Sequence, residues 1–200
     1  LKLETRTTGA SIWLMSNVYN SNFSGDLTFI TRTGGSSNSE RVRFRRDGGV
    51  CFNGDTAAAN ALDDYEEGTF TPQFLVGDSE SGISYSSREG VYTKVGRAVT
   101  VNIAIELSNN GSTNGQINIG GLPFTVGNIL TNTSHEASGA VGYMANFGVN
   151  VYMLSVSAGN STTVLYLMGQ ESHDTGFGHI QRNQTSNTFS FRASITYFVS

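Results

Sequence analysis

The sequence predicts an all-β chain, with a short β-stem followed by an antiparallel β-sandwich or jelly-roll head. Three observations predict this class. The 24 glycines, against only two prolines, indicate many tight turns. Charged residues make up 14% of the chain, which is typical of short strands and polar loops and not of surface helices. Apolar and polar residues alternate in most segments, and nothing indicates the strand–helix order of a parallel sheet.

The first part of the chain consists of short alternating segments, each with only two or three apolar side chains on a face. We expect strands at residues 2–8, 10–14, 26–32, 40–46 and 50–52. About 60 residues of this kind bury too little surface to be stable alone. We therefore predict that three chains wrap around a common axis here. A hairpin-rich domain that packs on the head is the alternative.

Residues 62–72 connect the two parts of the chain. A run of small residues precedes this stretch and predicts one or two helical turns over residues 56–62. The domains predicted on either side are a trimeric stem and neck at 1–64 and a head at 65–200. In a trimer the neck acids repel one another, and solvent, Arg43 or Arg45, or a cation would relieve that repulsion. The acids are Asp63, Asp64, Glu66 and Glu67.

The head contains longer alternating segments, of which residues 98–107 are the clearest. Five apolar side chains share one face there, which predicts a half-buried antiparallel strand. Residues 149–158 are apolar on both faces, which predicts a central strand or one at a subunit interface. Turns every 8–12 residues or so are typical of a sandwich or jelly roll. The other expected strands are residues 91–95, 116–120, 141–147, 162–168 and 188–199.

Composition argues against several classes of function. The net charge is −4 and the densest basic segment, residues 41–46, is interpreted as one polar face of a strand, so no nucleic-acid partner is expected. No apolar run approaches 18 residues, so no membrane insertion is expected. Cys51 is the only cysteine and is interpreted as a buried structural thiol. The chain starts in mid-pattern without a signal peptide, and we expect it to be a fragment whose stem continues upstream.

Metal, cofactor and catalytic motifs are absent from the sequence. His135, His173 and His179 lack the paired spacing of zinc ligands, and the neck acids lack the spacing of a calcium-binding EF-hand loop. No Gly-x-Ser-x-Gly motif occurs, and the remaining glutamates are scattered. We therefore expect no cofactor, no metal and no enzymatic activity.

The loop at residues 169–179 is the candidate binding site. It combines aromatic, amide, imidazole and carboxylate groups, and sugars bind to such mixtures through stacking and hydrogen bonds. For Phe177, ordinary core packing is the alternative. The candidate receptor-binding residues are Gln170, Glu171, His173, Asp174, Phe177 and His179.

Two segments resemble the distal parts of bacteriophage tail fibres and tail spikes. The first runs from Arg43 through the acidic stretch to Gly68-Thr69-Phe70-Thr71-Pro72, and is similar to their stem-to-head passage. The second is Gly90-Val91-Tyr92-Thr93-Lys94-Val95-Gly96-Arg97, followed by Gly120-Gly121-Leu122-Pro123-Phe124, and resembles the opening of their C-terminal β-sandwich. Together they cover roughly residues 43–125, whereas the C-terminal part matches only in strand pattern.

The resemblance implies a parallel homotrimer at the tip of a virion tail, joined to the rest of the tail. It would be made in the host cytoplasm, become extracellular after release, and bind a bacterial surface glycan or outer-membrane receptor. Two alternatives stay open: the head is a trimerisation and folding cap with recognition elsewhere, or the chain is the non-catalytic end of a depolymerising tail spike.

Overall fold

The computed structural model describes residues 10–16, 25–33, 38–130, 135–170 and 176–200. Across these residues the chain forms antiparallel strands and two short 3-10 helices, which confirms the predicted all-β class. The chain divides into two compact units, Leu1–Tyr65 and Glu66–Ser200. In the part that the structure describes, no helix is long and apolar enough to cross a membrane.

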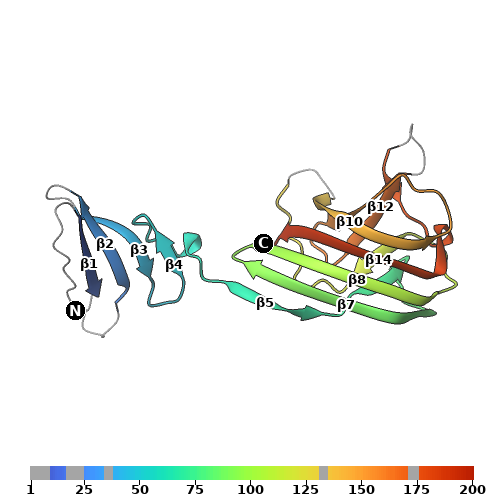
Figure 1. Ribbon diagram of the computed structural model, residues 1–200, viewed down its shortest axis with the longest axis horizontal. Coiled ribbons are helices and arrows are strands. Elements are labelled where there is room, and N and C mark those ends of the chain that lie inside the picture. Colours follow the sequence, from blue (N-terminus) through green and yellow to red (C-terminus); the bar gives the residue numbers. More distant parts are fainter. Residues whose placement is uncertain (1–9, 17–24, 34–37, 131–134, 171–175) are drawn as a thin grey trace. The chain divides into compact units, whose positions relative to one another are not determined.

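The N-terminal unit contains a four-stranded antiparallel sheet in the order β1-β2-β3-β4 (Figure 1). Its strands fall on predicted segments, whereas the strand expected at residues 2–8 lies outside the described residues. The alanine-rich run forms a single 3-10 turn, η1 (Ala58–Asn60). The strands are β1 (Ala10–Ser16), β2 (Leu27–Thr33), β3 (Asn38–Phe44) and β4 (Val50–Phe52).

This unit encloses few side chains. Among its described residues Cys51 and Thr28 are buried, whereas Phe44 and Phe52 are 45% and 52% exposed. Phe29 contacts Phe44 edge to face, with ring centroids 5.9 Å apart. The described part of the sheet therefore leaves large apolar side chains uncovered within one chain.

The arginines expected to neutralise the neck acids have other partners. Arg43 forms ion pairs with Asp26 and Glu40. Arg45 pairs with Asp47 and donates a hydrogen bond to the carbonyl of Thr56. These pairs hold neighbouring parts of the N-terminal unit together within one chain. The expectation that Arg43 or Arg45 relieves the neck acids concerns a trimer and stays a prediction.

The C-terminal unit is built on one ten-stranded antiparallel sheet. Its order is β5-β7-β8-β14-β10-β11-β12-β9-β6, with β13 paired to β12. In Figure 1 the long strands β7, β8 and β14 lie side by side. The strands are β5 (Tyr65–Phe70), β6 (Gln73–Val76), β7 (Ile83–Val95), β8 (Ala98–Asn110), β9 (Ile117–Gly120), β10 (His135–Phe147), β11 (Met153–Gly159), β12 (Leu165–Gln170), β13 (Gly178–His179) and β14 (Thr185–Phe198).

The sheet curls so that its last strands cover its middle ones. Phe74 on β6 packs against Phe189 on β14, with ring centroids 6.1 Å apart, although the two strands are far apart in the sheet order. Tyr85 on β7 helps to close the curl, because its hydroxyl accepts a hydrogen bond of 2.8 Å from the Phe74 amide and donates one to Glu80. Burial, together with the bond to Glu80, raises the pKa of Tyr85 to about 12.

One core fills the space between the two layers. The five apolar residues predicted to share a face of residues 98–107 are all buried in it. They meet buried side chains of β14 on the same layer and of β6, β9, β11 and β12 on the other, including Phe191, Val76, Ile119, Val156 and Leu167. The outward faces of both layers carry polar and small side chains together with some exposed large apolar ones, including Val91, Val95 and Tyr143.

The two segments that resemble tail-fibre proteins meet in this unit. Gly68 of β5 lies against the Tyr92 ring of β7, and Gly90 of β7 lies against the Phe70 ring of β5. A Cβ atom at Gly90 would fall 2.5 Å from the Phe70 ring. Phe124, from the Leu-Pro-Phe turn, packs on Tyr92 at 5.3 Å between centroids. The glycines are therefore needed because aromatic rings cover their backbone.

Several strands differ from their predicted bounds. β7 begins at Ile83 and β10 at His135, well before the apolar segments that predicted them. The strand expected at residues 149–158 forms as β11, and it is flanked by β10 and β12, as predicted for a central strand. It begins only at Met153. Within β11, Ser155 and Ser157 lie on the face opposite Val156, which faces the core.

Candidate functional site

A pocket of about 340 Å³ opens on the outward side of β10, β11 and β12. The register of these strands explains its composition. Ser138 on β10 pairs with Ser157 on β11, and Ser155 on β11 pairs with Met168 on β12. Because side chains alternate across a strand, these residues point to one face while Val156 and Leu167 point into the core. The lining residues are His135, Ser138, Ser155, Ser157, Met168 and Phe177.

Three rings gather beside the pocket. The ring centroids of His135 and Tyr166 are 5.4 Å apart, those of Tyr166 and His179 are 5.2 Å apart, and those of the two histidines are 6.3 Å apart. Tyr166 lies against Gly159, where an added Cβ would come within 2.8 Å of the tyrosine hydroxyl. The glycine therefore lets the Tyr166 ring lie close to the sheet, where both histidines contact it.

Hydrogen bonds fix the position of His135. Its Nδ1 lies 2.8 Å from the hydroxyl of Ser157, and that hydroxyl donates to the carbonyl of Ala137 at 3.2 Å. Since the single hydroxyl proton goes to Ala137, Nδ1 of His135 is the donor toward Ser157. The ring is thereby held at the edge of the pocket in one tautomer.

The surroundings of His179 favour its neutral form. Burial lowers the pKa of His179 below its usual range, and the nearby His135 lowers it further. Its buried Nδ1 has no hydrogen-bond partner among the described residues. A neutral imidazole keeps one donor and one acceptor nitrogen, so this side chain is suited to hydroxyl groups.

The described lining of the pocket has no carboxylate, lysine or arginine. It combines serine hydroxyls with the Met168 thioether and with Phe177, which is 45% exposed. This arrangement suits an uncharged ligand that has an apolar face and several hydroxyl groups. In the described ranges no three His, Cys, Asp or Glu side chains are placed to share a metal ion.

The sequence-predicted site residues fall into three groups. Phe177 lines the pocket and His179 packs on its histidine and tyrosine rings. Gln170 is on the same strand as Met168, two residues further along, and pairs with Met153 of β11. Glu171, His173 and Asp174 lie outside the described residues.

The serines, His135 and Met168 were not predicted as site residues. A signal for them existed in the sequence, since Ser155 and Ser157 alternate with core residues, as do Tyr166 and Met168. That alternation gives the outward face of each strand. It does not reveal which strands are neighbours, and the pocket exists only because β10, β11 and β12 are adjacent.

Comparisons with known proteins bear on the fold. No protein-family model matches the chain, and no curated protein matches it in sequence. Among solved structures it is similar to the Dettilon tailspike protein, with a TM-score of 0.52 and 22% sequence identity. The match covers 67% of this chain and 24% of that one, so the chain spans about a quarter of the tailspike's length. The matched part of the chain therefore has a fold that also occurs in part of a tailspike protein.

Proposed function

We propose that this chain is the distal tip of a bacteriophage tail fibre or tail spike, and that it attaches as a homotrimer to a glycan on the bacterial surface. Three findings support this proposal. The motif segments resemble tail-fibre proteins, the fold is similar to that of a tailspike, and the C-terminal unit carries a pocket with the chemistry of a sugar site. On this proposal the chain acts in the virion, joined to the rest of the tail.

The pocket is the observation that carries the proposal. Sugars present an apolar face of C–H groups and a rim of hydroxyls, so binding sites pair aromatic rings with polar groups that both donate and accept. Phe177 and Met168 offer the apolar contact here, and the three serines and His135 offer the hydrogen bonds. A glycan is therefore a better fit than an acidic or basic peptide.

The trimer is supported by the N-terminal unit. Leu27, Phe44, Phe52 and Leu62 are each at least 36% exposed in a single chain, and few of the side chains that the structure describes there are buried. Apolar surface that a chain cannot cover for itself is stabilised when further copies cover it. Three copies around one axis would give this thin sheet the core that it lacks.

We expect the chain to bind without catalysis. Glycoside hydrolysis uses a pair of carboxyl groups on either side of the scissile bond. The described lining of the pocket contains no carboxyl group, and its ionisable side chain is that of His135. Incubation with bacterial capsule or lipopolysaccharide is expected to release no oligosaccharide, and release would favour a depolymerising spike.

A glycan array with matched variants tests the proposal. Ser138→Trp places a large ring over the pocket from an exposed position, so we expect it to abolish binding of the glycans that the natural chain retains. Ser108→Trp makes the same change at an exposed position of β8 outside the pocket and is expected to bind normally. Equal binding by both variants, or no binding by the natural chain, would contradict the proposal. The latter result would favour a trimerisation cap.

A further inference from the structure

The sheet face that holds the glycan pocket continues beyond the pocket along the strands. On β11 the side chains of Ser157, Ser155 and Met153 share one face, because side chains alternate along a strand. Val156, between the two serines, is buried in the core. Met153 is 56% exposed and lies outside the lining of the pocket. The strand therefore presents a further apolar side chain directly beyond the pocket serines.

Two neighbouring side chains complete a row with Met153. Gln170 on β12 is its partner in the ladder between β11 and β12. β12 and β13 pair at Gly169 and Gly178, so the next position of that ladder sets Phe177 opposite Gln170. Phe177 is 45% exposed and also lines the pocket, so it borders both places. We call Met153, Gln170 and Phe177 the outer row.

The spacing and chemistry of the outer row suit a second sugar. Residues two apart on a strand are about 7 Å apart, so the outer row lies about one sugar ring beyond the row of Ser155 and Met168. Met153 and Phe177 place a thioether and an aromatic ring on either side of the Gln170 amide. This again pairs apolar surface with an amide, as sugar-binding sites do.

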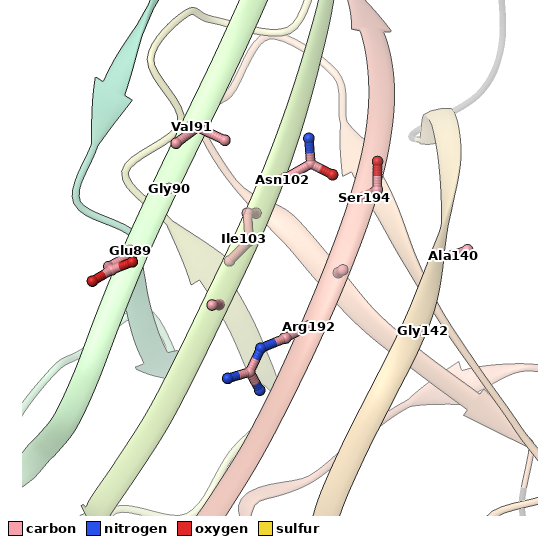
Figure 2. Close-up of a pocket in the computed structure, with 11 residues that line it drawn as sticks. Glu89, Gly90, Val91, Asn102, Ile103, Ala140, Gly142, Arg192 and Ser194 are labelled. Atoms are coloured by element: carbon pink, nitrogen blue, oxygen red, sulfur yellow. The ribbon is translucent and has the colours of Figure 1, made fainter.

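The absence of charge links the outer row to the pocket and separates it from a second hollow. The described residues of β11, β12 and β13 include no Asp, Glu, Lys or Arg. An open groove of about 420 Å³ lies over β7, β8, β14 and β10, where Figure 2 shows Glu89 and Arg192. The described lining of that groove has no aromatic ring. The outer row therefore shares the chemistry of the pocket, and the groove does not.

We propose that the outer row is a second sugar subsite, and that the chain binds a neutral oligosaccharide of at least two sugars. One sugar occupies the pocket and the next lies on the outer row. The glycan then runs along the strands, from Ser157 toward Met153, and Phe177 contacts both rings. This inference rests on the proposed function, because it extends the glycan pocket by one subsite.

Glycan fragments of increasing length test the second subsite. Partial acid hydrolysis of the glycan selected on the array gives fragments of one, two and three sugars. Competition against the intact glycan then measures the affinity of the full chain for each fragment. We expect the two-sugar fragment to bind at least about tenfold more tightly than either of its single sugars. The third sugar should add little.

Matched truncations assign the gain in affinity to the outer row. Met153→Ala and Gln170→Ala should each reduce the gain to about threefold or less, with single-sugar affinity unchanged within about twofold. Val91→Ala and Asn102→Ala make corresponding truncations at exposed residues of the groove in Figure 2, and both should keep the gain. The single-sugar affinity also shows that each variant is folded.

The outcomes separate the second subsite from the pocket itself. Single sugars that bind as tightly as the longer fragments, or a full gain in Met153→Ala and Gln170→Ala, would overturn the second subsite and leave the pocket intact. A gain lost only in Val91→Ala or Asn102→Ala would place the second sugar in the groove and also overturn the inference. A natural chain that binds no glycan, or a Ser138→Trp variant that binds normally, would overturn the proposed function.

Discussion

The packing around His179 lowers the pKa of this side chain, and this makes the stability of the fold depend on pH. In the folded chain its pKa is lowered by burial and by His135, whereas in the unfolded chain it titrates near its ordinary value of about 6.5. Below that value the unfolded chain takes up a proton that the folded chain resists. Acid therefore favours unfolding, and the loss of stability grows as the pH falls from the ordinary pKa to the lowered one.

The pH dependence of unfolding checks this account of His179. Replacing His179 with Gln removes the titrating group and keeps a polar side chain of similar length. We expect the drop in melting temperature between about pH 7.5 and about pH 5 to be smaller in His179→Gln than in the natural chain. The other titrating groups contribute equally to both proteins. The same drop in both would mean that His179 titrates normally.

At the scale of elements, the contact of β5 with β7 shows why the motif glycines matter. The Phe70 ring covers Gly90, and the Tyr92 ring covers Gly68, so each strand supplies one ring and one gap. The Tyr92 hydroxyl also donates to Glu66 at the start of the unit. These contacts hold β5 against β7 in addition to the backbone ladder between the two strands.

A glycine-to-alanine substitution tests this contact. Gly90→Ala would force the Phe70 ring to move, because the new Cβ atom would be 2.5 Å from it, and we expect a loss of about 1–3 kcal/mol in unfolding free energy. Gly178→Ala is the control, since no atom lies within 4 Å of its added Cβ, and its effect should stay within about 0.5 kcal/mol. Urea unfolding measures both. Equal effects would show that Phe70 moves at no cost.

A comparison of β8 with β7 shows which strands can be predicted from sequence patterns. Strict alternation at residues 98–107 placed every core residue of β8 correctly, because the period of two is set by the strand itself. The first half of β7 is mostly polar, with Ser84, Ser87 and Glu89, so its sequence lacks the apolar signal of a strand. It is a strand because its backbone pairs with β8 along its whole length.

The site was harder to predict than the fold, because its residues come together only through the pairing of strands. Phe177 and His179 were expected because their loop has a distinctive composition. His135 lies more than 40 residues away in sequence and reaches the pocket only through the pairing of β10 with β11. A single serine does not indicate a binding site in a chain rich in serine. The pocket serines form a site only because the strand order places them next to one another.

At the scale of the whole molecule, the two units differ in how they use apolar surface. The head encloses a large core between two layers of one curled sheet. The N-terminal unit has similar strands, but few of its described side chains are buried, and so we infer that it depends on other copies.

The most direct test of the central claim is a crystal structure of the chain bound to an oligosaccharide selected on the glycan array. We predict a sugar ring in the pocket between β10 and β12, with its apolar face on Phe177 and its hydroxyls bonded to Ser138, Ser155 or Ser157. A sugar bound with full occupancy elsewhere on the chain, and none in this pocket, would contradict the account.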